Sequence, residues 1–540
     1  MQDQKDVLRR FYSDEVPDET RETVTYFFDY CYGICPIFHP ASFVYRIVEG
    51  KVEKLLLDAM RAFVARIIMR KTGKRFDHEE IIKRIYQSLL LQLNDPSLDY
   101  VCAVVIAATM NGGEGDFIMF NSLSCMAVSL VTRLGWSTLD IDIKELPRTW
   151  EEWCTLEIKR RVFWLTYTND CYQSFLGNRP ITIGSLSPFV SAPKAEYTWE
   201  DMTVPQSSGW PCQTNISESN SDIVRNASVA HAFQDGCAIV SIMAKMGIFF
   251  WHFKVSLSSA STMNDNALNI RYRQNWSMKP IEIPQPLSNM LECAEFKALH
   301  ERLARWRDGL VRAEDLKRHW SPSFLFSEFG SHKHRLHIMR VRYFCLYGHF
   351  VTAFIILHLS NRPSFFSTPA CAAAAFKEPP LSTVASAEDK ALRDLLAYAF
   401  PGAIHEGFLA TDTLKESWDL CVDTVYEYVD FLNKNADIPL ERYDHVIPIS
   451  LFVCITVLIR SIRMCKQKID DLAGGADQER QQLVRARKEI IKDIRALRYM
   501  WSLLTDLGAV WQVRGMTDLL RIMQVEEMSN TAELLSDLEL

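Results

Sequence analysis

One stretch of the chain places charged side chains at spacings that could support acid–base chemistry. Glu157 and Arg161 lie four residues apart, and Asp170 and Arg179 follow further along the same stretch. Two carboxylates that flank one substrate bond stand within about 10 Å of each other. On a helix, Glu157 and Asp170 would be roughly 20 Å apart along the axis, at about 1.5 Å per residue. The spacing therefore favours ion pairing over catalysis.

We expect two separate contacts from these residues. The order of Glu157 and Arg161 suits an exposed ion pair on a helix. Arg179 follows the helix end expected at Gly177, where its side chain can fold back on Asp170. The second contact would be a structural clamp, and removing one partner from a partly desolvated pair would cost about 3 kcal/mol or more.

A histidine cluster is the most ligand-like group in the sequence. His334 and His337 are one helical turn apart, close to His332, and could share a metal ion. The side chains alongside are cationic and would repel a metal ion: Lys333, Arg335, Arg340 and Arg342. The cluster favours a solvated basic helix start, and contact with DNA phosphate or an acidic partner helix is the alternative.

Other enzyme signatures are missing from the sequence or stand in the wrong context. No G-x-S-x-G, H-E-x-x-H, P-loop or G-x-G-x-x-G pattern occurs. Lys71-Thr72-Gly73 imitates a penicillin-binding fragment, but it lies where a helix should end. Asp470-Asp471 is followed by a Gly-Gly turn and does not resemble the magnesium-binding clusters of a terpene cyclase. We expect no catalytic residue and no cofactor, and a helical enzyme or a scaffold without a DNA-related role is the alternative.

Helical periodicity dominates the elements that must position these residues. No segment of any length alternates with the period of a strand, and no internal repeat occurs. The pattern predicts an all-α fold, a multi-helix antiparallel array with long loops at about 184–226, 256–290 and 364–390. The expected helices lie at about 18–35, 53–71, 77–93, 97–111, 116–134, 150–177, 229–253, 291–310, 335–363, 390–400, 411–434, 443–467 and 477–504.

Composition narrows the classes of protein further. Apolar residues make up 48% of the 540 residues, enough for a packed core, and the net charge of −7 argues against nucleic-acid binding along the whole chain. The fourteen cysteines form no C-x-x-C pair, so we expect buried reduced thiols. The longest apolar run, at 446–459, is too short to span a membrane, and no membrane partner is expected.

Two segments carry a family resemblance. The first comprises Glu157, Arg160, Arg161, Phe163, Trp164, Asp170, Ser174, Gly177, Arg179 and Pro180. It resembles the most recognisable segment of the fungal-specific transcription factor domain, the regulatory region of fungal zinc-cluster activators. The second, with Pro36, His39, Pro40 and Phe43, resembles the element that opens this domain.

The resemblance implies a regulator of RNA polymerase II transcription in the nucleus. It implies partners in the transcription machinery or a regulatory protein, and leaves room for a small-molecule inducer and a homodimer. The six-cysteine cluster that holds zinc and reads DNA in this family is not found in the sequence. We therefore expect zinc and DNA to bind only through a DNA-reading segment that is absent or separate from this chain. The chain would then be a truncated product, a fragment or a family member without that segment.

The same patterns divide the chain into five parts. We expect an N-terminal tail at 1–17, an N-terminal helical part at 18–183, a mobile loop at 184–228 and a C-terminal helical part at 229–524. The last part, 525–540, mixes acidic residues with leucines. Such a tail suits either an activation segment that folds on a coactivator or a short packed terminal helix.

Overall fold

The computed structural model describes residues 4–74, 78–114, 116–141, 147, 149–177, 181–183, 190–193, 229–261, 294–310, 332–359, 412–444, 446–472 and 477–508. Within these ranges every regular element is a helix, which confirms the predicted all-α fold. The expected linker 364–390, the helix at 390–400 and the tail 525–540 lie outside the described residues.

The N-terminal half contains eight α-helices and two short helical segments among the described residues. They are α1 (Gln4–Phe11), α2 (Asp18–Tyr26), η1 (Phe27–Cys31), α3 (Pro40–Val48), α4 (Lys54–Thr72), α5 (His78–Leu91), α6 (Leu98–Glu114), α7 (Phe117–Arg133), η2 (Trp136–Thr138) and α8 (Trp150–Gly177). The C-terminal half contains α11 (Val229–Ser261), α13 (Ala294–Gly309), α14 (His332–Leu359), α17 (Asp412–Lys434), η8 (Leu440–Arg442), α18 (Ile447–Leu472) and α19 (Asp477–Leu507).

Local sequence signals explain several of these boundaries. The side chain of Asp116 accepts a hydrogen bond from the backbone N–H of Met119 over 2.9 Å and caps the start of α7. Gly73 and Gly135 adopt left-handed backbone angles, with φ of 71° and 72°, just after α4 and near the end of α7. A residue with a Cβ atom would be strained there, so both glycines stop a helix as the sequence predicts.

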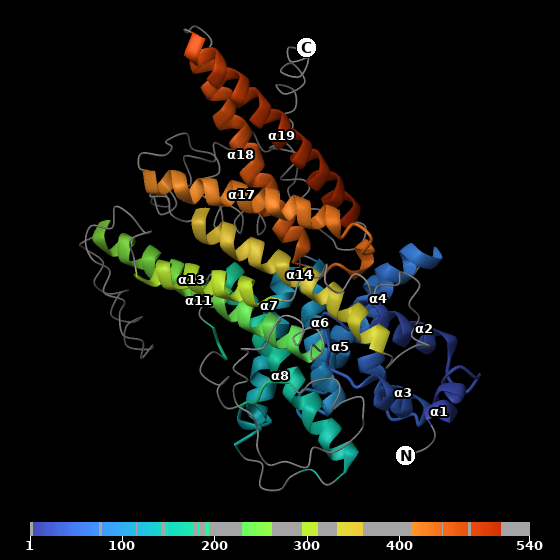
Figure 1. Ribbon diagram of the computed structural model, residues 1–540. Coiled ribbons are helices and arrows are strands. Elements are labelled where there is room, and N and C mark those ends of the chain that lie inside the picture. Colours follow the sequence, from blue (N-terminus) through green and yellow to red (C-terminus); the bar gives the residue numbers. More distant parts are fainter. Residues whose placement is uncertain are drawn as a thin grey trace, which may run out of the picture.

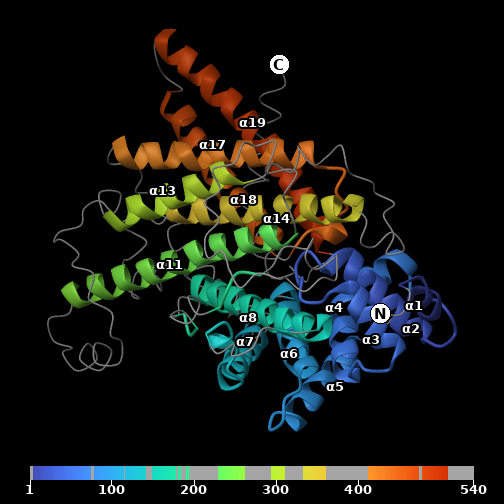
Figure 2. The same cartoon turned by 60° about the horizontal axis from the view of Figure 1, so that its bottom comes forward.

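The helices of the C-terminal half stack in layers on the N-terminal half. Figure 2 shows α8, α11, α14 and α17 lying one above another, and Figure 1 shows the hairpin of α18 and α19 projecting beyond them. α8 packs on α6 and α7 on one side and on α11 on the other, and α14 in turn contacts α11, α17 and α18. α8 is therefore an inner layer between the two halves.

The position of α8 overturns one expectation. The sequence predicts a helix with a single buried face, but from Glu157 to Ser174 almost every residue of α8 is buried. The cause is its neighbours, because α6, α7 and α11 cover the polar face as well as the apolar one. The glutamate and arginines on this face therefore lie in the interior.

Three segments are more helical than the sequence predicts. Residues Gln4–Phe11, expected within a tail, form α1, and Phe11 is fully buried. α6 runs through Gly112-Gly113 to Glu114, because Gly112 faces the ring of Phe120 on α7 and packing holds the helix together. α11 continues to Ser261, beyond the loop start expected at about 256.

Among the described residues, two helices are long and apolar enough to cross a membrane, judged by length and composition alone. They are the segments Ala232–Phe249 of α11 and Ile338–His358 of α14. Within the protein, 67% of the first window and 94% of the second are buried. Buried core helices of globular proteins have the same length and composition, so this property is weak support for a membrane span.

Candidate functional site: buried polar clusters around α8 and α14

The first motif forms a buried ionic cluster on α8. Glu157, Arg160 and Arg161 have no exposed surface, so the predicted exposed pair is wrong. Arg161 donates to Glu157 through Nε over 3.0 Å, and Arg160 donates to the other carboxylate oxygen. Arg160 also donates to Asp140 through Nη2 over 2.6 Å. Burial alone would raise the pKa of Asp140, but the hydrogen bonds and the charge of Arg160 outweigh burial and lower this pKa.

The two family motifs meet at Arg161. Its Nη1 donates to the carbonyl oxygen of Pro36 over 2.9 Å, across 125 positions of sequence. His39 then caps α3, because its Nδ1 accepts from the backbone N–H of Ser42 over 3.1 Å, and Pro40 fits the first helical position. Phe43 is buried against Phe38 with the two ring centroids 4.6 Å apart.

Asp170 anchors the chain that follows α8. Its Oδ2 accepts hydrogen bonds from the backbone N–H groups of Thr182 and Ile183 over 2.7 and 2.8 Å. Asp170 is completely buried. The expected partner Arg179, together with Pro180, lies outside the described residues, so the clamp between Asp170 and Arg179 stays a prediction.

Part of the expected mobile loop packs on α8. The indole N–H of Trp164 donates to the carbonyl oxygen of Ser191 over 2.8 Å, and Val190 is buried. The backbone N–H of Ser191 donates to Asp140, the partner of Arg160. Residues 190–193 therefore extend the ionic cluster, while the remainder of 184–228 lies outside the described residues.

Ser174 marks the closest approach between α8 and α11. Its hydroxyl is buried, and its carbonyl oxygen would lie 2.9 Å from a Cβ atom placed on Gly247. Real Cβ atoms do not come so near backbone oxygen. Gly247 thus lets the two helices touch near the end of α8 at Gly177, a contact that the sequence did not predict.

A second polar cluster connects α8 to α14 and to the segment before α18. The hydroxyl of Tyr172 donates to Nδ1 of His349 over 2.6 Å, and Nε2 of His349 lies 2.9 Å from Asp444. Arg342 places its Nη1 3.6 Å from the same carboxylate. All four side chains are buried, and burial lowers the pKa of His349, which keeps the ring neutral.

The basic patch expected on α14 is wrong for the residues whose side chains are described. Arg340 is fully buried and donates to Asp437 over 2.8 Å through both Nη1 and Nη2, and Arg342 is 6% exposed. The side chains of His332, His334 and His337 lie outside the described set. In the described part of the chain, no group of three or more histidine, cysteine, aspartate or glutamate side chains could hold a metal ion.

The cysteines agree with the sequence prediction. Each one that the structure describes is a reduced thiol, and of these Cys125 alone is exposed. Burial raises the pKa of Cys35 and Cys237 to about 12 and that of Cys154 to about 11. These thiols stay protonated and resemble small apolar core residues.

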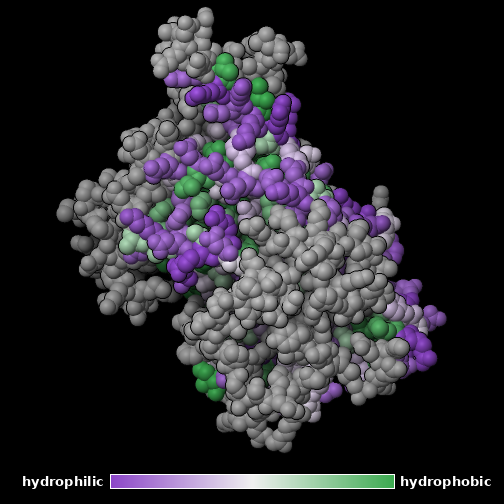
Figure 3. Space-filling view, viewed as in Figure 1, coloured by the Kyte–Doolittle hydropathy of each residue, from purple (hydrophilic) through white to green (hydrophobic). Residues whose placement is uncertain are grey.

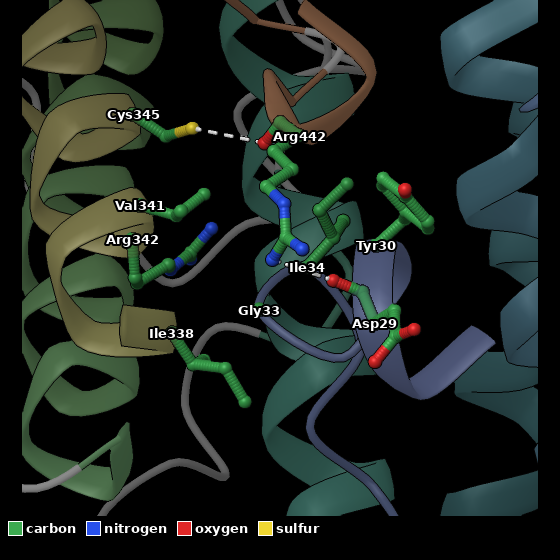
Figure 4. Close-up of a pocket in the computed structure, with 9 residues that line it drawn as sticks. All are labelled: Asp29, Tyr30, Gly33, Ile34, Ile338, Val341, Arg342, Cys345 and Arg442. Atoms are coloured by element: carbon green, nitrogen blue, oxygen red, sulfur yellow. Dashed lines mark hydrogen bonds between the residues drawn. The ribbon is translucent and has the colours of Figure 1, made fainter. Parts of the chain in front are cut away.

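Two openings lie close to these helices. A small cavity between η1, α14 and η8 is drawn in Figure 4, and its volume of about 10 Å³ suits one water molecule. A larger groove of about 640 Å³ runs between α17 and α19. It is lined by Tyr426, Val429, Asp430, Asn433, Lys488, Ile491, Lys492, Arg495, Ala496 and Tyr499.

Comparison with known proteins agrees with the two motifs. Residues 24–225 match the family model of the fungal specific transcription factor domain, the same domain that the two motifs resemble. The family is a regulatory domain rather than an enzyme family, works with other transcription or regulatory proteins, and is nuclear in general. No curated protein and no solved structure matches the chain.

Proposed function

We propose that the chain is the regulatory body of a fungal-type regulator of RNA polymerase II transcription, that it acts in the nucleus, and that it has no catalytic activity. The observation that carries the proposal is the family match over 24–225 together with the use of the motif residues. The charged motif residues on α8 form buried contacts with one another inside the fold: Glu157, Arg160 and Arg161. None of the three lines either opening described above.

The motif residues would act as a lock between the layers. The cluster around Glu157 ties α8 to the segment before α3 and to residues 190–193, and the cluster around His349 ties α8 to α14. A buried polar network tolerates few alternative arrangements, because each unpaired group is costly. Such a body suits a switch with two discrete packings, one of which exposes a surface for a coactivator or repressor.

We infer that the groove between α17 and α19 receives an anionic small-molecule effector with an aromatic or apolar part. Its volume lies in the range of ligand sites, about 300–1,000 Å³. Lys488, Lys492 and Arg495 supply three cationic side chains and Tyr426 and Tyr499 two rings. Figure 3 shows a mainly hydrophilic surface over this region, with a few hydrophobic residues.

The experiment is a reporter assay with this chain fused to a heterologous DNA-binding domain in yeast. The proposal expects reporter output that differs from that of the DNA-binding domain alone, and nuclear accumulation of a fluorescent fusion of the chain. An effector coupling of about 1–3 kcal/mol would change output roughly 5- to 150-fold. Unchanged output in every growth condition, with the fusion intact, would contradict a role in transcription.

The effector site is tested separately by thermal unfolding with a panel of aromatic carboxylates. A ligand at 100 times its Kd should stabilise the protein by about 2.7 kcal/mol, and Lys492→Met should abolish the shift. Arg305→Met, on the exposed side of α13, is the matched control because it removes a cation away from the groove. No shift with any compound argues against a ligand in this groove and leaves the reporter result untouched.

A further inference from the structure

The small cavity between η1, α14 and η8 holds two arginines that lack hydrogen-bond partners at Nε. Arg342, on α14, and Arg442, on η8, both line it and are each 6% exposed. Nε of each is buried without a partner. Figure 4 shows the two guanidinium groups reaching into the space between α14 and η1 from different elements.

The contacts that these arginines do make leave much of their hydrogen-bonding capacity unused. Arg442 donates through Nη1 to the carbonyl oxygen of Asp29 over 2.9 Å and lies over the ring of Tyr30, 4.9 Å from its centroid. Arg342 approaches Asp444, whose Oδ2 is closer to His349 than to the arginine, at 2.9 against 3.6 Å. A guanidinium group carries five N–H donors and remains charged inside a protein.

The other side chains around the cavity add little negative charge. Burial raises the pKa of Asp29 to about 7, raises that of the Tyr30 hydroxyl, and raises that of the Cys345 thiol well above its usual range. The tyrosine and the thiol are therefore neutral, and the Asp29 carboxyl is partly protonated near pH 7. Asp444 is charged and faces Arg342, and Glu441 is charged and attracts Arg442, but Glu441 also pairs with Arg70 and Lys71 over 3.1 and 3.0 Å.

From this geometry we propose that the cavity is a binding site for one small monovalent anion of halide size, which bridges Arg342 and Arg442. An anion accepts hydrogen bonds from both arginines and offsets the second buried charge, whereas a water molecule leaves that charge uncompensated. The volume of about 10 Å³ leaves room for one small ligand rather than for a carboxylate ligand or a phosphate. Because η1 belongs to the N-terminal half and α14 and η8 to the C-terminal half, a bound anion also ties the two halves together.

The first test compares sodium chloride, sodium bromide and sodium gluconate at equal ionic strength, using the full chain. We expect the midpoint of thermal unfolding to rise by about 1–3 °C between zero and 300 mM chloride relative to gluconate, and the rise to saturate. Arg442→Gln should lose this difference, and the exposed-residue control Arg305→Gln should keep it. Equal midpoints of the wild-type protein in chloride and gluconate would overturn the proposal.

The second test needs no variant and therefore does not depend on whether a substituted chain folds. Crystals of the wild-type protein soaked in bromide should show an anomalous-scattering peak between the guanidinium groups of Arg342 and Arg442. A density feature there without anomalous signal would be a water molecule, and the anion site would be wrong.

Discussion

The guanidinium group of Arg161 donates a hydrogen bond to the carbonyl oxygen of Pro36 over 2.9 Å, in the fully buried interior of the protein. The same guanidinium group binds Glu157 one helical turn earlier on α8. One side chain thus orients the α8 glutamate and fixes the entry of the chain into α3. This contact joins two motifs that lie far apart in the sequence.

The buried glutamate predicts a large loss of stability when its charge is removed. In Glu157→Gln, Arg160 and Arg161 remain buried with one carboxylate fewer, and breaking a buried pair in this way costs about 3–5 kcal/mol. The free energy of unfolding from urea titration measures the loss. Glu151→Gln, at an exposed position near the start of α8, should change the free energy of unfolding by less than about 0.5 kcal/mol. A loss below about 1 kcal/mol for Glu157→Gln would contradict the structural role of the cluster.

The contact between α8 and α11 predicts that Gly247→Ala destabilises the protein. The added Cβ would lie 2.9 Å from the carbonyl oxygen of Ser174 and 3.1 Å from Cα of Phe175, and backbone atoms cannot move aside cheaply. We expect a loss of about 1–3 kcal/mol in the free energy of unfolding. The control is Gly309→Ala at the end of α13, where a Cβ meets nothing within 4 Å. There the change should be neutral or favourable, and equal effects at the two sites would refute the close approach.

Much of the fold follows from the sequence because helical periodicity and helix ends are local signals. Gly73, Gly135 and the capping residue Asp116 stand where the chain stops or starts a helix, and the structure confirms them. The extent of α6 past Gly112 was not predictable, since it depends on the ring of Phe120 from the next helix. At such positions, packing against a neighbouring helix outweighs the low helix propensity of glycine.

Local spacing draws attention to the charged residues of α8 but does not reveal what surrounds them. The spacing of Glu157 and Arg161 predicts an ion pair, which the structure contains. The spacing does not predict which other helices bury this pair. For the same reason Arg340 and Arg342 were expected in solvent, while their acidic partners Asp437 and Asp444 come about 100 positions later. The cluster of Tyr172, His349 and Asp444 is likewise assembled from three distant segments, which no local pattern announces.

Buried histidines predict a loss of stability at acid pH. Burial lowers the pKa of His358 to about 3, with a further decrease from His300, whose Nδ1 lies 3.0 Å from His358 Nε2. The unfolded chain protonates this histidine below about pH 6.5, and the folded protein does not. Stability is therefore complete above pH 6.5 and falls as pH decreases, by about 2 kcal/mol between pH 6.5 and pH 5.

His358→Gln tests this prediction, because glutamine does not titrate and can still bond the hydroxyl of Ser417, which lies 2.7 Å from His358 Nδ1. The free energy of unfolding of the variant should vary less between pH 6.5 and pH 5 than that of the wild-type protein, by about 2 kcal/mol. An unchanged pH dependence would show that His358 already binds a proton in the folded state.

Asp29 predicts a pH dependence of opposite sign. Burial raises the pKa of its carboxyl to about 7 in the folded protein, although the charge of Arg442 lowers it in part. The unfolded chain has already lost this proton above about pH 4, so the folded state binds more protons between pH 4 and pH 7. Its contribution is present at low pH and is lost as pH rises through this window.

In Asp29→Asn the side chain stays neutral at every pH. The stability of the variant relative to the wild-type protein should therefore increase as pH rises. We expect the difference in free energy of unfolding to shift in favour of the variant by about 1–3 kcal/mol between pH 5 and pH 8. Asp14→Asn is the matched control, since Asp14 is an exposed carboxylate, and the free energy of unfolding of this variant should stay within about 0.5 kcal/mol of the wild-type value. A constant difference for Asp29→Asn would mean that Arg442 holds the carboxylate charged throughout, because a group ionised in both states contributes no pH dependence.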